Sequence, residues 1–92
     1  MLLNNVSVVE DYGMYNTRIR HAIMPNCLSI GKSSFSDSKD LIYLHAPSVE
    51  TIDGYAFMYC SKLSNVNIIG AKSIGNRAFA DTDIRSLEFN RL

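Results

Sequence analysis

Short stretches in which apolar and polar residues alternate recur along the chain. In the stretch 41–46, Leu44 and Ala46 alternate with Tyr43 and His45. Strict alternation is typical of a β-strand that buries one face and exposes the other. The pattern predicts five strands, at about residues 3–8, 19–24, 41–46, 63–68 and 84–89.

These stretches belong to a repeat of 22 residues. Three sets of residues share this spacing, namely Phe35, Phe57 and Phe79; Ile30, Ile52 and Ile74; and Ser38, Cys60 and Thr82. After Thr82 the spacing shortens by one, so that Leu63 corresponds to Ile84. One copy is too small to bury its own apolar edge, whereas stacked copies share a core. The repeat therefore predicts a solenoid in which the three Phe rings lie over one another.

The connections between the predicted strands indicate how the strands pair. About 16 residues separate consecutive strands, which is too long for a hairpin and suits a parallel crossover. Within each connection, the segments 32–38, 54–60 and 76–82 read as short helices or turns whose Phe points inward.

The most regular part of the repeat also resembles a known family. Residues 52–57 read Ile-Asp-Gly-Tyr-Ala-Phe and residues 74–79 read Ile-Gly-Asn-Arg-Ala-Phe, and in the first of these copies Cys60 and Leu63 follow. This pattern is similar to that of the BspA-like subclass of the leucine-rich repeats. The resemblance implies an α/β solenoid, with about five parallel strands on the concave face of a right-handed coil and short helix or turn segments on the convex side. It also implies binding rather than catalysis.

We expect a single repeat domain over residues 1–92. Its expected parts are an amino-terminal capping segment (1–18), a degenerate repeat (19–29), three repeats (30–51, 52–73 and 74–89) and a tail (90–92). In the capping segment, Tyr12, Met14 and Tyr15 lie where the degenerate copy lacks its Phe. We expect these three side chains to fill the core of the first coil.

The outward positions of the predicted strands form a candidate binding surface. Polar, amide and aromatic side chains on a rigid sheet suit protein recognition, although the same positions could simply be solvated. The sequence predicts that a protein partner contacts His21, Ile23, Tyr43, His45, Asn65, Asn67, Ser86 and Glu88. The first predicted strand would add Asn5 and Ser7 to this surface.

A second candidate surface is the carboxy-terminal edge of the solenoid. The last repeat of a solenoid exposes its apolar side and an unpaired strand unless something caps it. We expect such an edge to pair with another chain, either a second copy or a target. The residues expected there are Phe79, Ile84, Leu87 and Phe89.

Catalytic and metal-binding arrangements are not predicted. Zinc sites use three or four protein ligands, whereas His21 and His45 have only the distant Glu88 on the same face. Cys27 and Cys60 occupy columns of small residues and read as buried, reduced thiols. We therefore expect no cofactor, no metal and no enzymatic activity.

Composition narrows the class of partner. The 92 residues include nine Lys+Arg and nine Asp+Glu, so the net charge is zero, which disfavours nucleic acid. No signal peptide or apolar run long enough to cross a membrane is found, so we expect a cytoplasmic protein, in the host cytosol if a virus encodes it.

The principal hypothesis is a non-catalytic protein-interaction module. The alternatives are a small antagonist of a larger cytosolic complex, of the kind that phages or mobile elements encode, and an enzyme.

Overall fold

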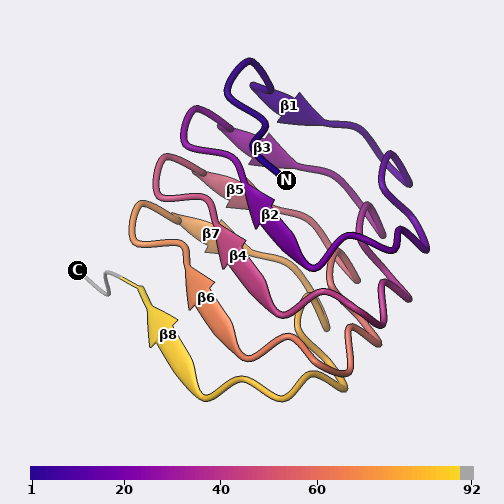
Figure 1. Cartoon of the computed structure of the whole chain (residues 1–92). Coiled ribbons are helices and arrows are strands. Elements are labelled where there is room, and N and C mark those ends of the chain that lie inside the picture. The colour runs from indigo at the N-terminus through magenta and orange to yellow at the C-terminus, as the bar shows by residue number, and fades with distance from the viewer. Residues whose placement is uncertain (90–92) are drawn as a thin grey trace.

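The computed structural model describes residues 1–89, and the expected tail 90–92 lies outside the described residues. Eight short strands form two parallel, four-stranded sheets (Figure 1). One sheet contains β1 (Val8–Val9), β3 (Ser29–Ile30), β5 (Thr51–Ile52) and β7 (Ser73–Ile74). The other contains β2 (His21–Ile23), β4 (Tyr43–His45), β6 (Asn65–Asn67) and β8 (Ser86–Glu88). Each coil of the chain gives one strand to each sheet, so four coils stack into a solenoid.

Equivalent residues of successive coils lie in register. In the second sheet, Tyr43 pairs with His21 on one side and with Asn65 on the other. Asn65 then pairs with Ser86, a spacing of 21 residues that confirms the predicted one-residue slip after Thr82. The predicted parallel solenoid is therefore confirmed. The two-residue strands of the first sheet were not predicted, because a strand of that length is too short to show alternation.

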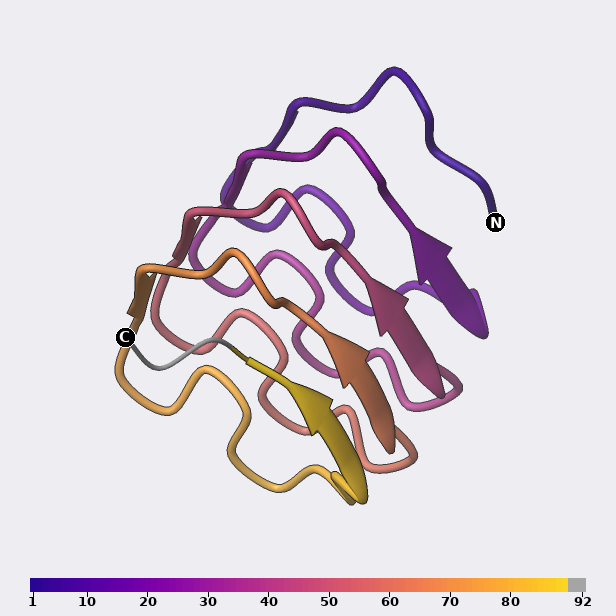
Figure 2. The same ribbon diagram turned by 90° about the vertical axis from the view of Figure 1, so that its left-hand side faces the viewer.

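A ladder of turns joins the two strands of each coil, at residues 11–16, 32–37, 54–59 and 76–81 (Figure 2). Alternate backbone N–H groups donate to the next coil. The N–H of Phe35 donates to the Ala56 carbonyl at 2.7 Å, and the N–H of Phe57 donates to the Ala78 carbonyl at the same distance. The second and sixth residues of each turn have positive φ, as at Tyr55 (60°) and Tyr59 (63°). We call the surface formed by these four segments the turn face.

This ladder corrects the expected α/β class. Residues 1–89 contain no helix, and so none that could span a membrane. In an α-helix, each backbone N–H donates to the carbonyl four residues earlier, and each residue has a right-handed backbone conformation. In the turn face, half of the N–H groups donate to a neighbouring coil, and every fourth residue is left-handed. The segments 32–38, 54–60 and 76–82 are therefore turns. The sequence left short helices and turns open for these segments, and the turns are confirmed.

The expectation of a fifth strand at residues 3–8 is also wrong. Only Leu2 continues the second sheet, through an isolated parallel bridge to Ile23. The chain then turns at Asn4 and Asn5, residues that favour turns, and crosses to the first sheet, where it forms β1. Asn5 and Ser7 consequently do not extend the row of outward side chains on the second sheet.

The core consists of columns of equivalent apolar side chains. Phe35, Phe57 and Phe79 are stacked as predicted, with ring centroids 5.0 and 5.2 Å apart and interplanar angles of 11° and 2°. This spacing is close to the separation of about 4.8 Å between paired strands, so the coil rise sets the stacking distance. Other fully buried columns contain Ile30 and Ile52; Leu41 and Leu63; and Cys27 and Val49.

The first coil fills the end of the core with fewer side chains than expected. Met14 packs against the core, and its N–H donates to the Ser34 carbonyl at 2.7 Å. Tyr12 and Tyr15 instead remain 57% and 50% exposed. Their rings pack edge to face on each other, with ring centroids 5.9 Å apart. The register of β1 and β3 pairs residues 21 apart, so Met14 rather than either tyrosine takes the position of Phe35 in the first coil. The expectation that all three side chains fill the core is therefore wrong for the two tyrosines.

Candidate functional site

Two rows of side chains cover the outward surface of β2, β4, β6 and β8, which we call the sheet face. Strand pairing places one residue of each row on every strand, as the alternation predicted. One row is His21, Tyr43, Asn65 and Ser86, and the other is Ile23, His45, Asn67 and Glu88. The intervening Ala22, Leu44 and Val66 are buried. All eight residues predicted from the sequence therefore lie on one surface.

An aromatic cluster occupies the β2–β4 half of the sheet face. The Tyr43 hydroxyl oxygen lies 3.1 Å from Nδ1 of His45, within hydrogen-bonding distance. The His21 ring packs edge to face on Tyr43, with ring centroids 6.2 Å apart. Because a hydroxyl both donates and accepts, the Tyr43 hydroxyl can bond Nδ1 of His45 in either tautomer of the imidazole. The cluster is therefore a partly buried polar and aromatic surface held in one geometry.

The β6–β8 half of the sheet face carries amide, hydroxyl and carboxylate groups. The side-chain oxygen of Asn67 accepts a hydrogen bond from the Ile69 N–H at 3.2 Å, which holds the turn after β6. Asn65, Ser86 and Glu88 are exposed. This half can donate and accept hydrogen bonds, and Glu88 adds one negative charge at its end.

The four residues predicted for the carboxy-terminal edge all lie in the last described coil. Phe79, Ile84 and Phe89 are partly buried and pack against the core, because each covers its counterpart in the preceding coil. Leu87 is 50% exposed, and Ile74 in β7 is 38% exposed although Ile30 and Ile52 in the same column are buried. Among residues 1–89, β7 and β8 have a hydrogen-bonded neighbour on one side only.

Both cysteines are buried and unbridged, as predicted. The Cys60 thiol donates to the Phe35 carbonyl at 3.1 Å, and the Cys27 thiol donates to the Ser29 carbonyl at 3.3 Å. Burial raises the pKa of the Cys60 thiol to about 12 and also raises the pKa of Cys27. Since the thiolate is the reactive form, these side chains are structural rather than nucleophilic.

No group of three or more His, Cys, Asp or Glu side chains is close enough to hold a metal ion anywhere in residues 1–89. Tyr43 lies between His21 and His45 and contacts both rings. The two imidazoles therefore belong to the aromatic cluster.

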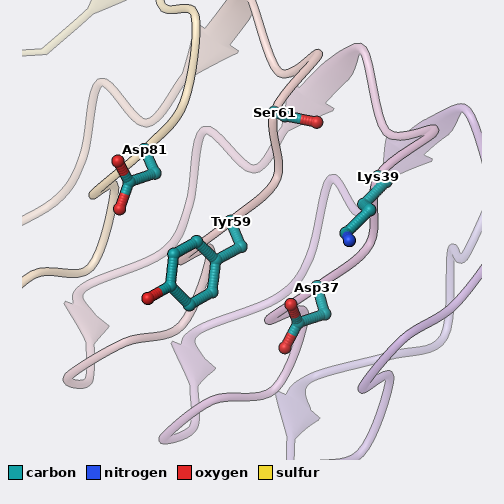
Figure 3. A pocket seen from close by; sticks show the side chains of 5 residues that line it. All are labelled: Asp37, Lys39, Tyr59, Ser61 and Asp81. Carbon is teal, nitrogen blue, oxygen red and sulfur yellow. The ribbon is translucent and has the colours of Figure 1, made fainter.

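Sequence reasoning missed a hollow at the end of the turn face. Asp37 and Lys39 of the second coil, Tyr59 and Ser61 of the third and Asp81 of the fourth line it (Figure 3). Its volume is about 470 Å³. The spacing of 22 residues between Asp37, Tyr59 and Asp81 is a signal that could have pointed to it, because the stacked repeat makes that spacing a column.

The chain was compared with protein families, curated proteins and solved structures. The family model described as a BspA type leucine rich repeat region (6 copies) matches residues 1–92, the whole sequence. No curated protein and no solved structure matches the chain. The family match agrees with the 22-residue repeat, the parallel strands and the stacked phenylalanines described above. The chain therefore belongs to the BspA-type leucine-rich repeat family.

Proposed function

We propose that this protein is a non-catalytic interaction module that binds a protein partner through the sheet face. Repeats of this family generally mediate protein–protein interaction, and the rigid sheet supplies a surface suited to that role. The supporting observation is the hydrogen-bonded pair Tyr43 and His45, with His21 packed against it. Tyr adds contact area at low entropic cost, and a side chain already fixed loses little entropy on binding.

The chemistry of the buried side chains supports a non-catalytic role. The nucleophilic candidates Cys27 and Cys60 are buried with raised pKa values, and His45 is bonded to the phenolic hydroxyl of Tyr43 rather than to a serine, threonine or cysteine side chain. Turnover of a substrate that is abolished in a folded His45→Ala variant would overturn this part of the proposal.

Affinity capture from a lysate of the source cells, read by mass spectrometry, tests the sheet face. The test variant is Tyr43→Ala combined with Asn65→Ala. The control is Thr51→Ala combined with Ser73→Ala, since both of these residues are exposed on the other sheet. We expect the control to retain one stoichiometric partner and the test variant to lose it. A partner retained by the test variant and lost by the control would assign binding to the other sheet.

We also propose that the edge formed by β7 and β8 pairs with a second copy of the chain. The support is the apolar surface of Leu87 and Ile74 beside strands that have backbone groups unpaired among residues 1–89. Light scattering at micromolar concentration should show association that Leu87→Asp reduces. A wild-type monomer whose Leu87→Asp variant behaves identically would contradict the proposal.

A further inference from the structure

The hollow on the turn face combines an aromatic ring with two carboxylates that flank it. In Figure 3, the Tyr59 ring lies between Asp37 and Asp81, and Lys39 extends from beside Asp37. Tyr59 is 45% exposed although it belongs to a tightly stacked coil. Small-molecule sites in proteins occupy about 300–1,000 Å³, so a hollow of about 470 Å³ has room for one side chain of a partner.

The backbone holds the three side chains in one column. Asp37, Tyr59 and Asp81 have nearly equal positive φ angles of 62°, 63° and 58°. The Asp37 N–H donates to the Met58 carbonyl at 2.9 Å, and the Tyr59 N–H donates to the Ala80 carbonyl at 3.0 Å. The side chains therefore leave the chain in the same direction, one coil apart. With coils about 4.8 Å apart, the two aspartates lie about 10 Å from each other on either side of the ring.

The charge of the hollow is negative. Asp37 and Asp81 carry two negative charges, and Lys39 carries one positive charge. Of the cations on the adjoining coils, Lys62 lies 3.8 Å from Asp40 and Arg85 lies 3.0 Å from Asp83, whereas Arg18 lines a second hollow that also includes Asp37 and Lys39. The residues that line the hollow around Tyr59 therefore have a net charge of −1, and Asp81 is its carboxylate farther from Lys39 (Figure 3).

A second tyrosine lies near Asp37. The Asp37 carboxylate raises the pKa of the exposed Tyr15 hydroxyl, because it favours the protonated phenol as a hydrogen-bond acceptor and repels the phenolate. Tyr15 belongs to the first coil and Tyr59 to the third, so a tyrosine of each neighbouring coil lies near Asp37.

We propose that the hollow binds an arginine side chain of a partner peptide, with the guanidinium flat on the Tyr59 ring and its N–H groups directed at Asp37 and Asp81. A guanidinium with a hydrogen bond at each edge spans about 8 Å, which fits between carboxylates on coils about 10 Å apart. The planar cation stacks on an aromatic ring, whereas a lysine ammonium is a point charge that reaches one carboxylate at a time. This site lies on the turn face and does not depend on the sheet face.

A titration followed by NMR of the backbone amides tests the site at low ionic strength. The probes are a capped hexapeptide of alternating arginine and serine and the same peptide with lysine in place of arginine. We expect the largest shifts at residues 37, 59 and 81, and an affinity for the arginine peptide about fivefold above that for the lysine peptide. Equal affinities, or shifts confined to the sheet face, would overturn the proposal.

Matched variants separate the site from general charge attraction. Tyr59→Asn removes the ring, and Tyr55→Asn is its control because both tyrosines are left-handed residues of the same turn, a conformation that Asn accepts. Asp81→Asn removes one carboxylate, and Asp53→Asn is its exposed control. We expect Tyr59→Asn and Asp81→Asn each to weaken arginine-peptide binding about fivefold, and the controls to change it less than twofold. Loss of binding in the controls to the same extent would contradict the assignment.

Discussion

The rings of Phe57 and Phe79 are parallel to within 2°, with their centroids 5.2 Å apart. Phe57 is covered on both faces, by Phe35 and by Phe79, and is fully buried, whereas Phe79 stacks on Phe57 alone among residues 1–89 and is partly buried. The contribution of each ring to stability therefore depends on its position in the stack.

We expect Phe57→Ala to lower the free energy of unfolding by about 3–5 kcal/mol, because it removes a buried ring and leaves a cavity between two coils. Phe79→Ala should lower the free energy of unfolding by less, since Phe79 is only partly buried. Urea denaturation followed by circular dichroism measures both. Equal losses of unfolding free energy would show that covering a ring on both faces does not increase its contribution to stability.

Ser34→Ala should stabilise the protein. Ser34 is fully buried, and its hydroxyl oxygen has no hydrogen-bond partner among residues 1–89. The equivalent residues Ala56 and Ala78 carry only a methyl group. Removing an unpaired buried hydroxyl should raise the free energy of unfolding by about 1 kcal/mol.

The control for that change is Ser36→Ala. The Ser36 hydroxyl donates to the Met58 carbonyl at 3.2 Å, so its loss should lower the free energy of unfolding by about 1 kcal/mol. The same urea titration gives both values. Two changes of the same sign would contradict this interpretation of the buried hydroxyls.

Gly31→Ala should destabilise the solenoid through contact between coils. A Cβ at Gly31 would lie 2.7 Å from the Asp11 nitrogen and 2.8 Å from the Glu10 carbonyl carbon, both of which are backbone atoms. One coil would have to move away from the next, and we expect a loss of about 1–3 kcal/mol.

Gly54→Ala is the matched control, because the nearest atom to its added Cβ is the Asn76 carbonyl oxygen at 3.3 Å. Thermal melts of the two variants should differ, with Gly31→Ala melting lower. The prediction fails if Gly54→Ala is the less stable of the two.

The contribution of Cys60 to stability should decline at alkaline pH. Burial raises the pKa of its thiol from 9.0 to about 12 in the folded protein. Between these values the unfolded chain loses this proton and the folded chain retains it, so the free energy of unfolding falls as pH rises. The stability difference between the wild type and Cys60→Ala, measured by urea titration, should therefore be smaller at pH 10.5 than at pH 8.

The same burial should protect the thiol from reagents. We expect Cys60 to react with a disulfide reagent at pH 8 far more slowly in the native protein than in urea. Cys27→Ala isolates the signal of Cys60. Native and denatured rates of similar size would mean that the thiol is accessible in the folded chain.

The sheet face could be predicted residue by residue because alternation and the repeat together specify it. Once Tyr43 is outward and 22 residues separate the copies, Asn65 must lie beside it, and the structure shows that pairing. The bond between Tyr43 and His45 could not be foreseen, because it depends on side-chain rotamers. The expected strand at residues 3–8 failed because apolar spacing alone does not reveal the turn at Asn4 and Asn5.

The repeat period, the parallel stacking and the inward Phe column follow from the sequence alone, since apolar residues at a constant spacing can be buried together only when copies lie over one another. The first sheet, the turn ladder and the hollow around Tyr59 were decided by the tertiary structure. They arise from backbone hydrogen bonds between coils, in which every residue type except proline can donate and which left-handed residues such as Asp37 and Asp81 accommodate. The pattern of apolar and polar residues indicates which side chains are buried, but it does not indicate which carbonyl accepts from each backbone N–H group.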